Sequence, residues 1–319
     1  MTRDNTQSSR RCFLAGAAAV GTIGSFGLMP TKGVASDATS NDGQRSFREV
    51  TSFRVEATRA RKIATSADRV YVGADRNVRV YDLTGTSLAT TELPRPVRCL
   101  DVSPGGRLHV GTMHEIHVFD MSGRRVASWE DFGKESILSD IATSKNEVFT
   151  ADAGNHVIWR LDHEGKRLGE IANAKQEFNP PTSFFTIAST SAGLHVANPR
   201  RHHIETYDED GRQVASWGQR SRSLSGFSGC CNPVSFVVLP TGEFVTAERG
   251  QPRVKLFGAD GKFKQLIADI SDFSENSKVA ASDNGLGCNT GGFDLAVGDS
   301  GQVVLLDCAT NEVRVYSQL

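Results

Sequence analysis

The sequence lacks a long apolar run that would span a bilayer. A membrane span needs about 20 predominantly apolar residues, and the best candidate, residues 12–29, is interrupted by many glycines. An excess of positive charge is also missing. Of the 36 basic and 37 acidic groups, residues 1–35 hold four and one, which leaves 32 and 36 in the remainder. Nucleic-acid-binding domains usually carry a positive excess, so the composition disfavours a nucleic acid as a partner.

Catalytic signatures are missing as well. The sequence contains no glycine-rich phosphate loop, no Ser/His/Asp arrangement and no pair of carboxylates at a spacing typical of general acid–base catalysis. No complete catalytic set is visible, and this favours a binding function over an enzymatic one.

Proline is scarce beside glycine, with 10 prolines against 31 glycines. Short apolar runs rich in valine, separated by glycine, are typical of β structure with many turns. The 319 residues are too few for three ordinary domains. Hydrophobic residues make up 38% and charged residues 23%, as in soluble globular proteins.

The first residues resemble a twin-arginine export signal, whose motif is Ser-Arg-Arg-x-Phe-Leu-Lys. The matching residues are Ser9, Arg10, Arg11, Phe13 and Leu14. Ala15 stands where the motif has lysine, and small residues at 33–35 offer a cleavage site. The resemblance implies a signal peptide over residues 1–35, a linker over 36–45 and a periplasmic or extracellular mature protein. Such proteins cross the membrane folded, often because they have already bound a cofactor.

From residue 46 onward the sequence repeats itself six times. Each copy has an alternating strand, an aromatic residue or leucine and, in most copies, an acidic residue and glycine: NVRVYDLTG (77–85), EIHVFDMSG (115–123), HVIWRLDHEG (156–165), HHIETYDEDG (202–211), RVKLFGADG (253–261) and NEVRVYSQL (311–319). Alternation with a period of two, broken by Gly and Asp turns, predicts antiparallel strands. Six repeats of four strands predict an all-β, six-bladed β-propeller over residues 46–319.

The last repeat ends at its third strand. A spare strand-like segment, residues 46–58, precedes the first repeat. We therefore expect this segment to pair with the C-terminal strand and to close the ring, which would leave no exposed sheet edge there.

The repeats resemble NHL repeats. The copy ADAGNHVIWRLDHEGKRLGEI (151–171) is similar to that pattern, and the resemblance covers about residues 60–319. The family includes peptide-amidating lyases, relatives of sugar lactonases, and RNA- or protein-binding modules. The resemblance implies the fold more firmly than the activity. The function that we expect is a monomeric binding module, which presents the face with its long loops and cysteines to a periplasmic protein, peptide or glycan.

Four cysteines lie in the last third of the chain: Cys230, Cys231, Cys288 and Cys308. Cys231 precedes Phe236 by the same spacing, in a Cys-Asn-x-x-x-Phe register, as Cys288 precedes Phe293. Loops that enter innermost strands open near the axial channel, and they share a face with loops between second and third strands. We therefore expect the four thiols to gather on one face, with Cys231 and Cys288 at the channel mouth.

Three roles stay open for these cysteines. Disulfides suit an exported protein. A thiolate-bound metal or Fe–S cluster suits four sulfur ligands, and one thiol could be a redox centre or nucleophile. The alternative to a binding module is thus a metal- or Fe–S-bearing periplasmic enzyme, redox or hydrolytic, that uses Cys230, Cys231 and Cys288. The earlier Cys99, within an inner strand, is expected to be a buried apolar side chain.

Histidines and acids recur at equivalent blade positions without forming an obvious site. His114, His156 and His202 fall five residues before the strand anchors of three consecutive blades. We expect them to be turn or surface residues. The equivalent acids Asp152, Glu248 and Asp307 are expected to cap backbone N–H groups in turns. We identify no set of axial carboxylates.

Overall fold

The computed structural model of the protein describes residues 46–129, 132–171, 185–282 and 292–319. The predicted signal peptide and linker lie outside these ranges. The described residues form antiparallel strands, with one short helix, α1 (Glu275–Ser282), and one 3-10 turn, η1 (Ile270–Asp272). Within these ranges no helix is long and apolar enough to cross a membrane.

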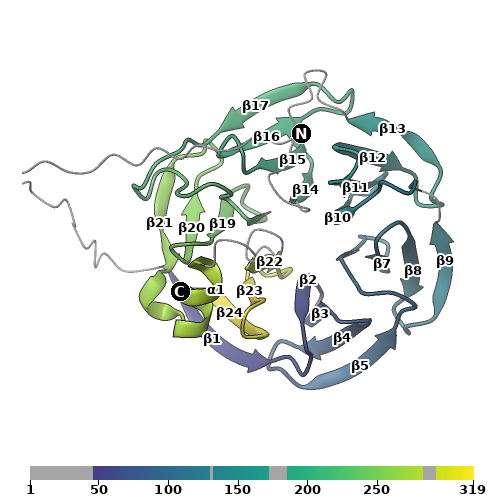
Figure 1. Ribbon diagram of the computed structural model, residues 1–319, viewed down its shortest axis with the longest axis horizontal. Coiled ribbons are helices and arrows are strands. Elements are labelled where there is room, and N and C mark those ends of the chain that lie inside the picture. Colours follow the sequence, from purple (N-terminus) through teal and green to yellow (C-terminus); the bar gives the residue numbers. More distant parts are fainter. Residues whose placement is uncertain (1–45, 130–131, 172–184, 283–291) are drawn as a thin grey trace, which may run out of the picture. The chain divides into compact units, whose positions relative to one another are not determined.

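Six four-stranded sheets surround a common axis, as predicted (Figure 1). Their strands, from axis to rim, are β2 (Ala60–Ser66), β3 (Arg69–Ala74), β4 (Asn77–Asp82) and β5 (Ser87–Glu92) in blade one; β6 (Cys99–Val102), β7 (Arg107–Gly111), β8 (Ile116–Asp120) and β9 (Arg125–Trp129) in blade two; β10 (Leu138–Thr143), β11 (Val148–Asp152), β12 (Val157–Leu161) and β13 (Arg167–Ile171) in blade three; β14 (Ile187–Thr190), β15 (Gly193–Asn198), β16 (His203–Tyr207) and β17 (Gln213–Trp217) in blade four; β18 (Ser235–Val238), β19 (Phe244–Glu248), β20 (Arg253–Phe257) and β21 (Phe263–Ala268) in blade five.

Blade six combines both ends of the described chain. It contains β22 (Phe293–Val297), β23 (Val303–Asp307) and β24 (Glu312–Gln318), and its outer strand is β1 (Phe47–Arg54). The sheet order is β1-β24-β23-β22, and β1 runs antiparallel to β24 from the pair Phe47–Gln318 to the pair Arg54–Glu312. The predicted closure of the ring by the N-terminal strand is confirmed.

The Asp-x-x-Gly segments form tight turns between third and fourth strands. In blade one, the Oδ1 atom of Asp82 accepts hydrogen bonds from the backbone N–H groups of Thr84 and Thr86, at 2.9 and 2.8 Å. Gly85 follows with a φ of 90°, a conformation that glycine adopts without strain. The Thr84 hydroxyl and these N–H groups stabilise the carboxylate and lower the pKa of Asp82 to about 2.

The core lies between neighbouring blades, where apolar residues from facing sheets interlock. Two indoles illustrate the fit. A Cβ atom at Gly165 would collide with the ring of Trp129 from the preceding blade, and one at Gly261 would collide with Trp217. These turn glycines therefore allow each tryptophan to pack between its own blade and the next one.

An axial cavity of about 250 Å³ is lined by the innermost strands of all six blades. Each innermost strand has one edge without a strand partner, because its sheet ends there. Side chains that project from these strands must therefore satisfy the backbone groups of that edge or leave them to solvent.

Candidate functional site

A ring of six residues, five from innermost strands and Thr186 from the position directly before β14, surrounds the axis at one level. Each lies opposite the equivalent position of its second strand, and the six are Lys62, Cys99, Asp140, Thr186, Ser235 and Asp294. Five of the six are polar or charged. This axial ring brings together residues from the whole length of the propeller.

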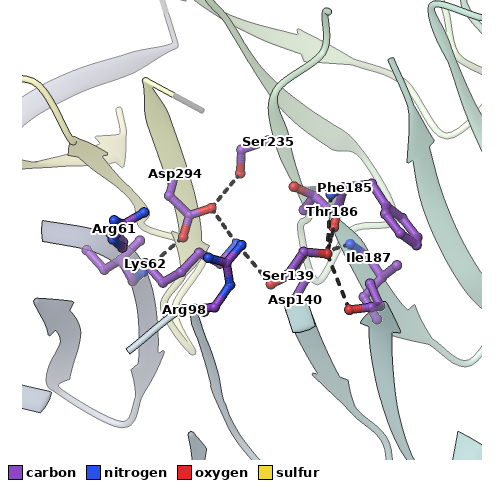
Figure 2. Close-up of polar contacts among 12 residues, drawn as sticks. Arg61, Lys62, Arg98, Ser139, Asp140, Phe185, Thr186, Ile187, Ser235 and Asp294 are labelled. Carbon is purple, nitrogen blue, oxygen red and sulfur yellow. Dashed lines mark hydrogen bonds and ion pairs between the residues drawn. The ribbon is translucent and has the colours of Figure 1, made fainter. Parts of the chain in front are cut away.

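Lys62 joins two carboxylates across the axial ring. Its Nζ atom lies 2.9 Å from Oδ1 of Asp140 and 3.0 Å from Oδ1 of Asp294. The hydroxyl of Ser235 donates to the same Asp294 oxygen at 3.0 Å. Figure 2 shows Lys62, Asp294 and Ser235 converging from three blades. This ion-pair network ties blades one, three, five and six to one another.

The carboxylates also satisfy the free edges of neighbouring strands. The Oδ2 atom of Asp294 accepts from the N–H group of Ile63, and that of Asp140 accepts from Ile187, both at 2.9 Å. Asp101, one pleat further along the channel, accepts from the N–H group of Thr143 at 2.8 Å. Each acid thus holds the innermost strand of the following blade. A large part of this network is therefore structural.

Burial and the attraction of an opposite charge shift the pKa values of the axial groups in opposite directions. Burial alone would lower the pKa of Lys62, but attraction by Asp140 and Asp294 raises it above its ordinary value. Lys62 is therefore an ammonium ion. Burial raises the pKa of Asp140, and repulsion from Asp294 adds to this although Lys62 opposes it. Burial likewise raises the pKa of Asp101 to about 6.

Two arginines, Arg61 and Arg98, lie beside the axial ring. Arg61 precedes Lys62 at a β-bulge, where the pairing of β2 with β3 slips between Ala60 and Lys62. Bulges redirect a side chain in this way. Arg98 immediately precedes β6 of the next blade and donates from Nε to the carbonyl of Leu138 at 3.0 Å. Figure 2 shows both arginines next to Lys62.

Arg61 is half-buried, and no hydrogen bond or ion pair joins its guanidinium group to any described residue. Burial lowers its pKa, and repulsion from Arg59 and Arg98 lowers it further. Desolvated charges in proteins are usually paired. Within the described ranges, Arg61 therefore presents a positive group beside the axial ring that has no hydrogen-bond or ion-pair partner, although Cys308 and Asp75 attract it at longer range.

The predicted cysteine cluster is tested only in part, because Cys288 lies outside the described residues. Cys230 and Cys231 contact each other, with their sulfur atoms 3.0 Å apart. Cys308 lies against β2, where its thiol donates to the carbonyl of Arg61 at 3.7 Å. Burial and the nearby Asp294 raise the pKa of Cys308, so this thiol is neutral at neutral pH.

A metal centre is not visible in the part of the chain that the structure describes. There, no group of three or more His, Cys, Asp and Glu side chains is arranged to hold a metal ion. Cys99 is fully buried among apolar side chains of blades two and three, as predicted.

The equivalent histidines and acids serve local structure. His156 and His202 have positive φ values of 59° and 61° in loops, and the Nε2 atom of His202 lies 2.9 Å from the carbonyl oxygen of Gly229. Asp152 caps the backbone N–H groups of its turn, and Asp307 caps that of Ala309 at 2.9 Å, as predicted.

The prediction for Glu248 was wrong. This side chain caps no turn: it is fully buried and forms an ion pair with Lys255, which is equally buried. The Lys255 ammonium also donates to the carbonyl of Leu224 at 3.2 Å and lies over the ring of Phe227. The pair thereby holds the long loop of residues 218–232 against blade five.

Sequence reasoning missed the axial ring, although a signal was present. The innermost strands of blades one and three, ARKIATS and LSDIATS, end in the same four residues, and Lys62 aligns with Asp140. Opposite charges at equivalent positions of a ring indicate contact across the axis. In blade six the strand FDLAVGD must be shifted by one residue before Asp294 joins the same column, and this obscured the pattern.

No protein-family model matches the sequence, and no curated protein matches it. Solved structures do match the fold. A streptogramin B lyase is 12% identical with a TM-score of 0.55, and the match covers 86% of this chain and 97% of that one. Virginiamycin B lyase from Staphylococcus aureus is 10% identical with a TM-score of 0.55, covering 86% and 100%.

The WD40 β-propeller domain of Doa1 is as similar, at 10% identity and a TM-score of 0.55, covering 86% of this chain and 97% of that one. Identities this low show the shared propeller architecture and nothing of activity. A lyase and a WD40 domain fit the chain equally well, so the function must be argued from the site itself.

Proposed function

We propose that this protein is an exported ligand-binding β-propeller that recognises an oxyanion group, a carboxylate, sulfate or phosphate, at the mouth of its axial channel. Arg61 is the main contact, and Arg98 on the neighbouring blade assists it. The observation that carries the proposal is the half-buried guanidinium of Arg61, which forms no ion pair or hydrogen bond with any described residue and is repelled by Arg59 and Arg98 more than Asp75 attracts it.

An oxyanion would satisfy this group both electrostatically and geometrically. Guanidinium groups bind carboxylates and phosphates through two parallel hydrogen bonds. Partial burial strengthens such bonds because the local dielectric is lower than in water. Lys62 is less suited to this task, since Asp140 and Asp294 already neutralise it. The positive charge without an ion-pair partner among the described residues therefore comes from Arg61.

The axial ring would give this site a rigid base. Arg61 directly precedes Lys62, whose ammonium is fixed by two carboxylates, and the carbonyl of Arg61 accepts from the thiol of Cys308. A backbone held on both sides keeps the guanidinium in place before the ligand arrives. Such preorganisation lowers the entropy lost on binding.

The proposal is tested by isothermal titration calorimetry with sulfate, phosphate, succinate and an acidic oligosaccharide, with the matching neutral oligosaccharide as a negative probe. At least one anionic probe should bind, and Arg61→Gln should weaken that binding tenfold or more, since losing a charged hydrogen-bond partner costs about 1.5–3 kcal/mol. Arg125→Gln, on the exposed outer strand β9, is the matched control and should bind like the parent. Equal binding by Arg61→Gln and the parent contradicts the proposal.

Export rests on the resemblance of residues 9–14 to a twin-arginine signal. We expect Arg10→Lys combined with Arg11→Lys to retain the full-length precursor in the cytoplasm. Cell fractionation and immunoblotting measure this, with Arg3→Lys as the matched control. Normal export of the double variant would refute the twin-arginine route and leave the binding proposal unaffected.

A further inference from the structure

Cys230 and Cys231 are adjacent thiols of unequal exposure. They lie in the loop of residues 218–232 that leads from β17 to β18. Their sulfur atoms are 3.0 Å apart. Cys230 is exposed to solvent, whereas Cys231 is only 3% exposed. A reagent in solution therefore reaches Cys230 first, and among the described cysteines the sulfur of Cys231 is the one in contact with a modified Cys230.

Hydrogen bonds fix the backbone on both sides of this thiol pair. The side-chain amide of Asn232 donates from Nδ2 to the backbone carbonyls of Ser228 and Arg249, at 2.7 and 2.9 Å. The N–H group of Arg249 donates back to the Asn232 side chain at 2.9 Å. On the other side, His202 lies 2.9 Å from the carbonyl of Gly229. The thiols thus sit in a short segment that is held at its ends, which gives them a high effective concentration toward each other.

We propose that Cys230 and Cys231 are a reversible dithiol–disulfide couple that reacts with low-molecular-weight disulfides. The Cys230 thiolate attacks one sulfur of R–S–S–R, forms a mixed disulfide and releases one RS⁻. The Cys231 thiolate then attacks the sulfur of Cys230 and releases the second RS⁻. Overall, two protein thiols lose two protons and two electrons, and the small disulfide becomes two thiols.

Reversibility follows from the position of the two residues. Adjacent Cα atoms are about 3.8 Å apart across a trans peptide, below the usual range of about 4.4–6.8 Å for a disulfide. A vicinal disulfide is therefore strained, and strained disulfides are reduced more easily than structural ones. The segment leads into the innermost strand β18, just as Arg98 leads into β6, so both lie on the same face of the propeller. The couple would alter the surface beside the channel mouth.

The test uses the intact protein, equilibrated in glutathione buffers of increasing oxidised fraction, alkylated and digested with trypsin. The peptide of residues 223–249 contains both cysteines and no others, and residues 279–314 contain Cys288 and Cys308. We expect the oxidised 223–249 peptide to carry no alkyl group and to be about 2 Da lighter than the unalkylated dithiol peptide. After reduction with dithiothreitol, both of its thiols should be alkylated. Its disulfide-to-dithiol ratio should rise about tenfold for each tenfold rise in [GSSG]/[GSH]².

Two single variants separate the steps. Cys231→Ser should trap a mixed disulfide on Cys230, about 305 Da heavier, whereas Cys230→Ser should react at least tenfold more slowly because Cys231 is buried. Cys308→Ser is the matched control and should keep the parental profile. A 223–249 peptide that keeps two alkylated thiols in fully oxidised buffer overturns the proposal. A disulfide between the 223–249 and 279–314 peptides overturns it in favour of a bond between blades.

Discussion

Lys62 and Lys255 are two buried ammonium groups in different parts of the propeller, and their surroundings shift their pKa values in opposite directions. Burial lowers the pKa of both. At the axis, two carboxylates outweigh this effect and raise the pKa of Lys62. In blade five, the single carboxylate of Glu248 does not, and the pKa of Lys255 stays below its ordinary value.

The two lysines also connect different parts of the molecule. Lys62 links carboxylates of two other blades, so its charge holds the ring together at the axis. Lys255 pairs with Glu248 of its own blade and reaches the carbonyls of Leu224 and Gly226 in the adjacent loop. The comparison indicates that a lysine with two carboxylate partners secures the scaffold, whereas a lysine with one carboxylate partner and two loop carbonyls secures a loop.

The largest expected effect comes from removing the charge in blade five. Lys255→Met leaves Glu248 buried without its partner and should lower the free energy of unfolding by about 3–5 kcal/mol. Urea denaturation measures this loss, and limited trypsinolysis at Arg222 should become faster as the loop is released. The double variant Lys255→Met/Glu248→Gln should recover most of the stability. If the single variant is as stable as the parent, the buried pair does not hold the loop.

At the axis, the corresponding change should cost less and depend on pH. Lys62→Met leaves Asp140 and Asp294 facing each other, but a proton can replace the ammonium because the pKa of Asp140 is already raised. We expect a loss of about 2–3 kcal/mol at pH 8 that shrinks toward pH 5, since stability that depends on a bound proton is present below the folded-state pKa and lost above it. A loss that is the same at both pH values would contradict this account.

A smaller effect is expected at Asp101, which lacks a lysine partner. Its pKa in the folded protein is about 6, against an ordinary value of 3.8, so the folded state binds the proton more tightly. Wild-type stability should therefore fall as pH rises from about 4 to 6 and stay level above that. Asp101→Asn keeps an acceptor for Thr143 and should be more stable at pH 7.5 by roughly 1–2 kcal/mol, with no difference at pH 4. Parallel pH profiles of the two proteins would show that Asp101 titrates normally.

The sequence was sufficient to predict the propeller because the residue pattern within each repeat indicates where its strands and turns lie. Alternating strands and Asp-x-x-Gly turns recur in register, and the missing outer strand of blade six has an obvious replacement in residues 46–58. These features depend on neighbours in sequence, and periodicity identifies such features well.

The charged contacts could not be predicted in the same way. Lys62 and Asp294 are 232 residues apart, and Lys255 reaches a loop about 30 residues earlier in the chain. A repeat pattern indicates where strands lie but not which side chains meet across the axis. For the cysteines, the spacing suggested a partnership of Cys231 with Cys288, which lies outside the described residues, and it did not indicate the contact between Cys231 and Cys230.

Arg61 is the residue on which the proposed function depends, and its substitution should have a distinctive effect on stability. A half-buried cation without a counter-ion contributes little to folding and is repelled by Arg59 and Arg98. Arg61→Gln should therefore leave the free protein as stable as the parent or slightly more stable. If Arg61 had a structural role, its replacement would instead lower the free energy of unfolding.

The most direct test measures the free energy of unfolding of the parent and Arg61→Gln, with and without the tightest-binding anion, at constant ionic strength. At ten times its Kd this anion should stabilise the parent by about 1.4 kcal/mol and the variant by a small fraction of that, while the two proteins are equally stable in chloride alone. A variant that is destabilised in chloride yet gains as much from the anion as the parent would contradict the assignment of Arg61 as the binding residue.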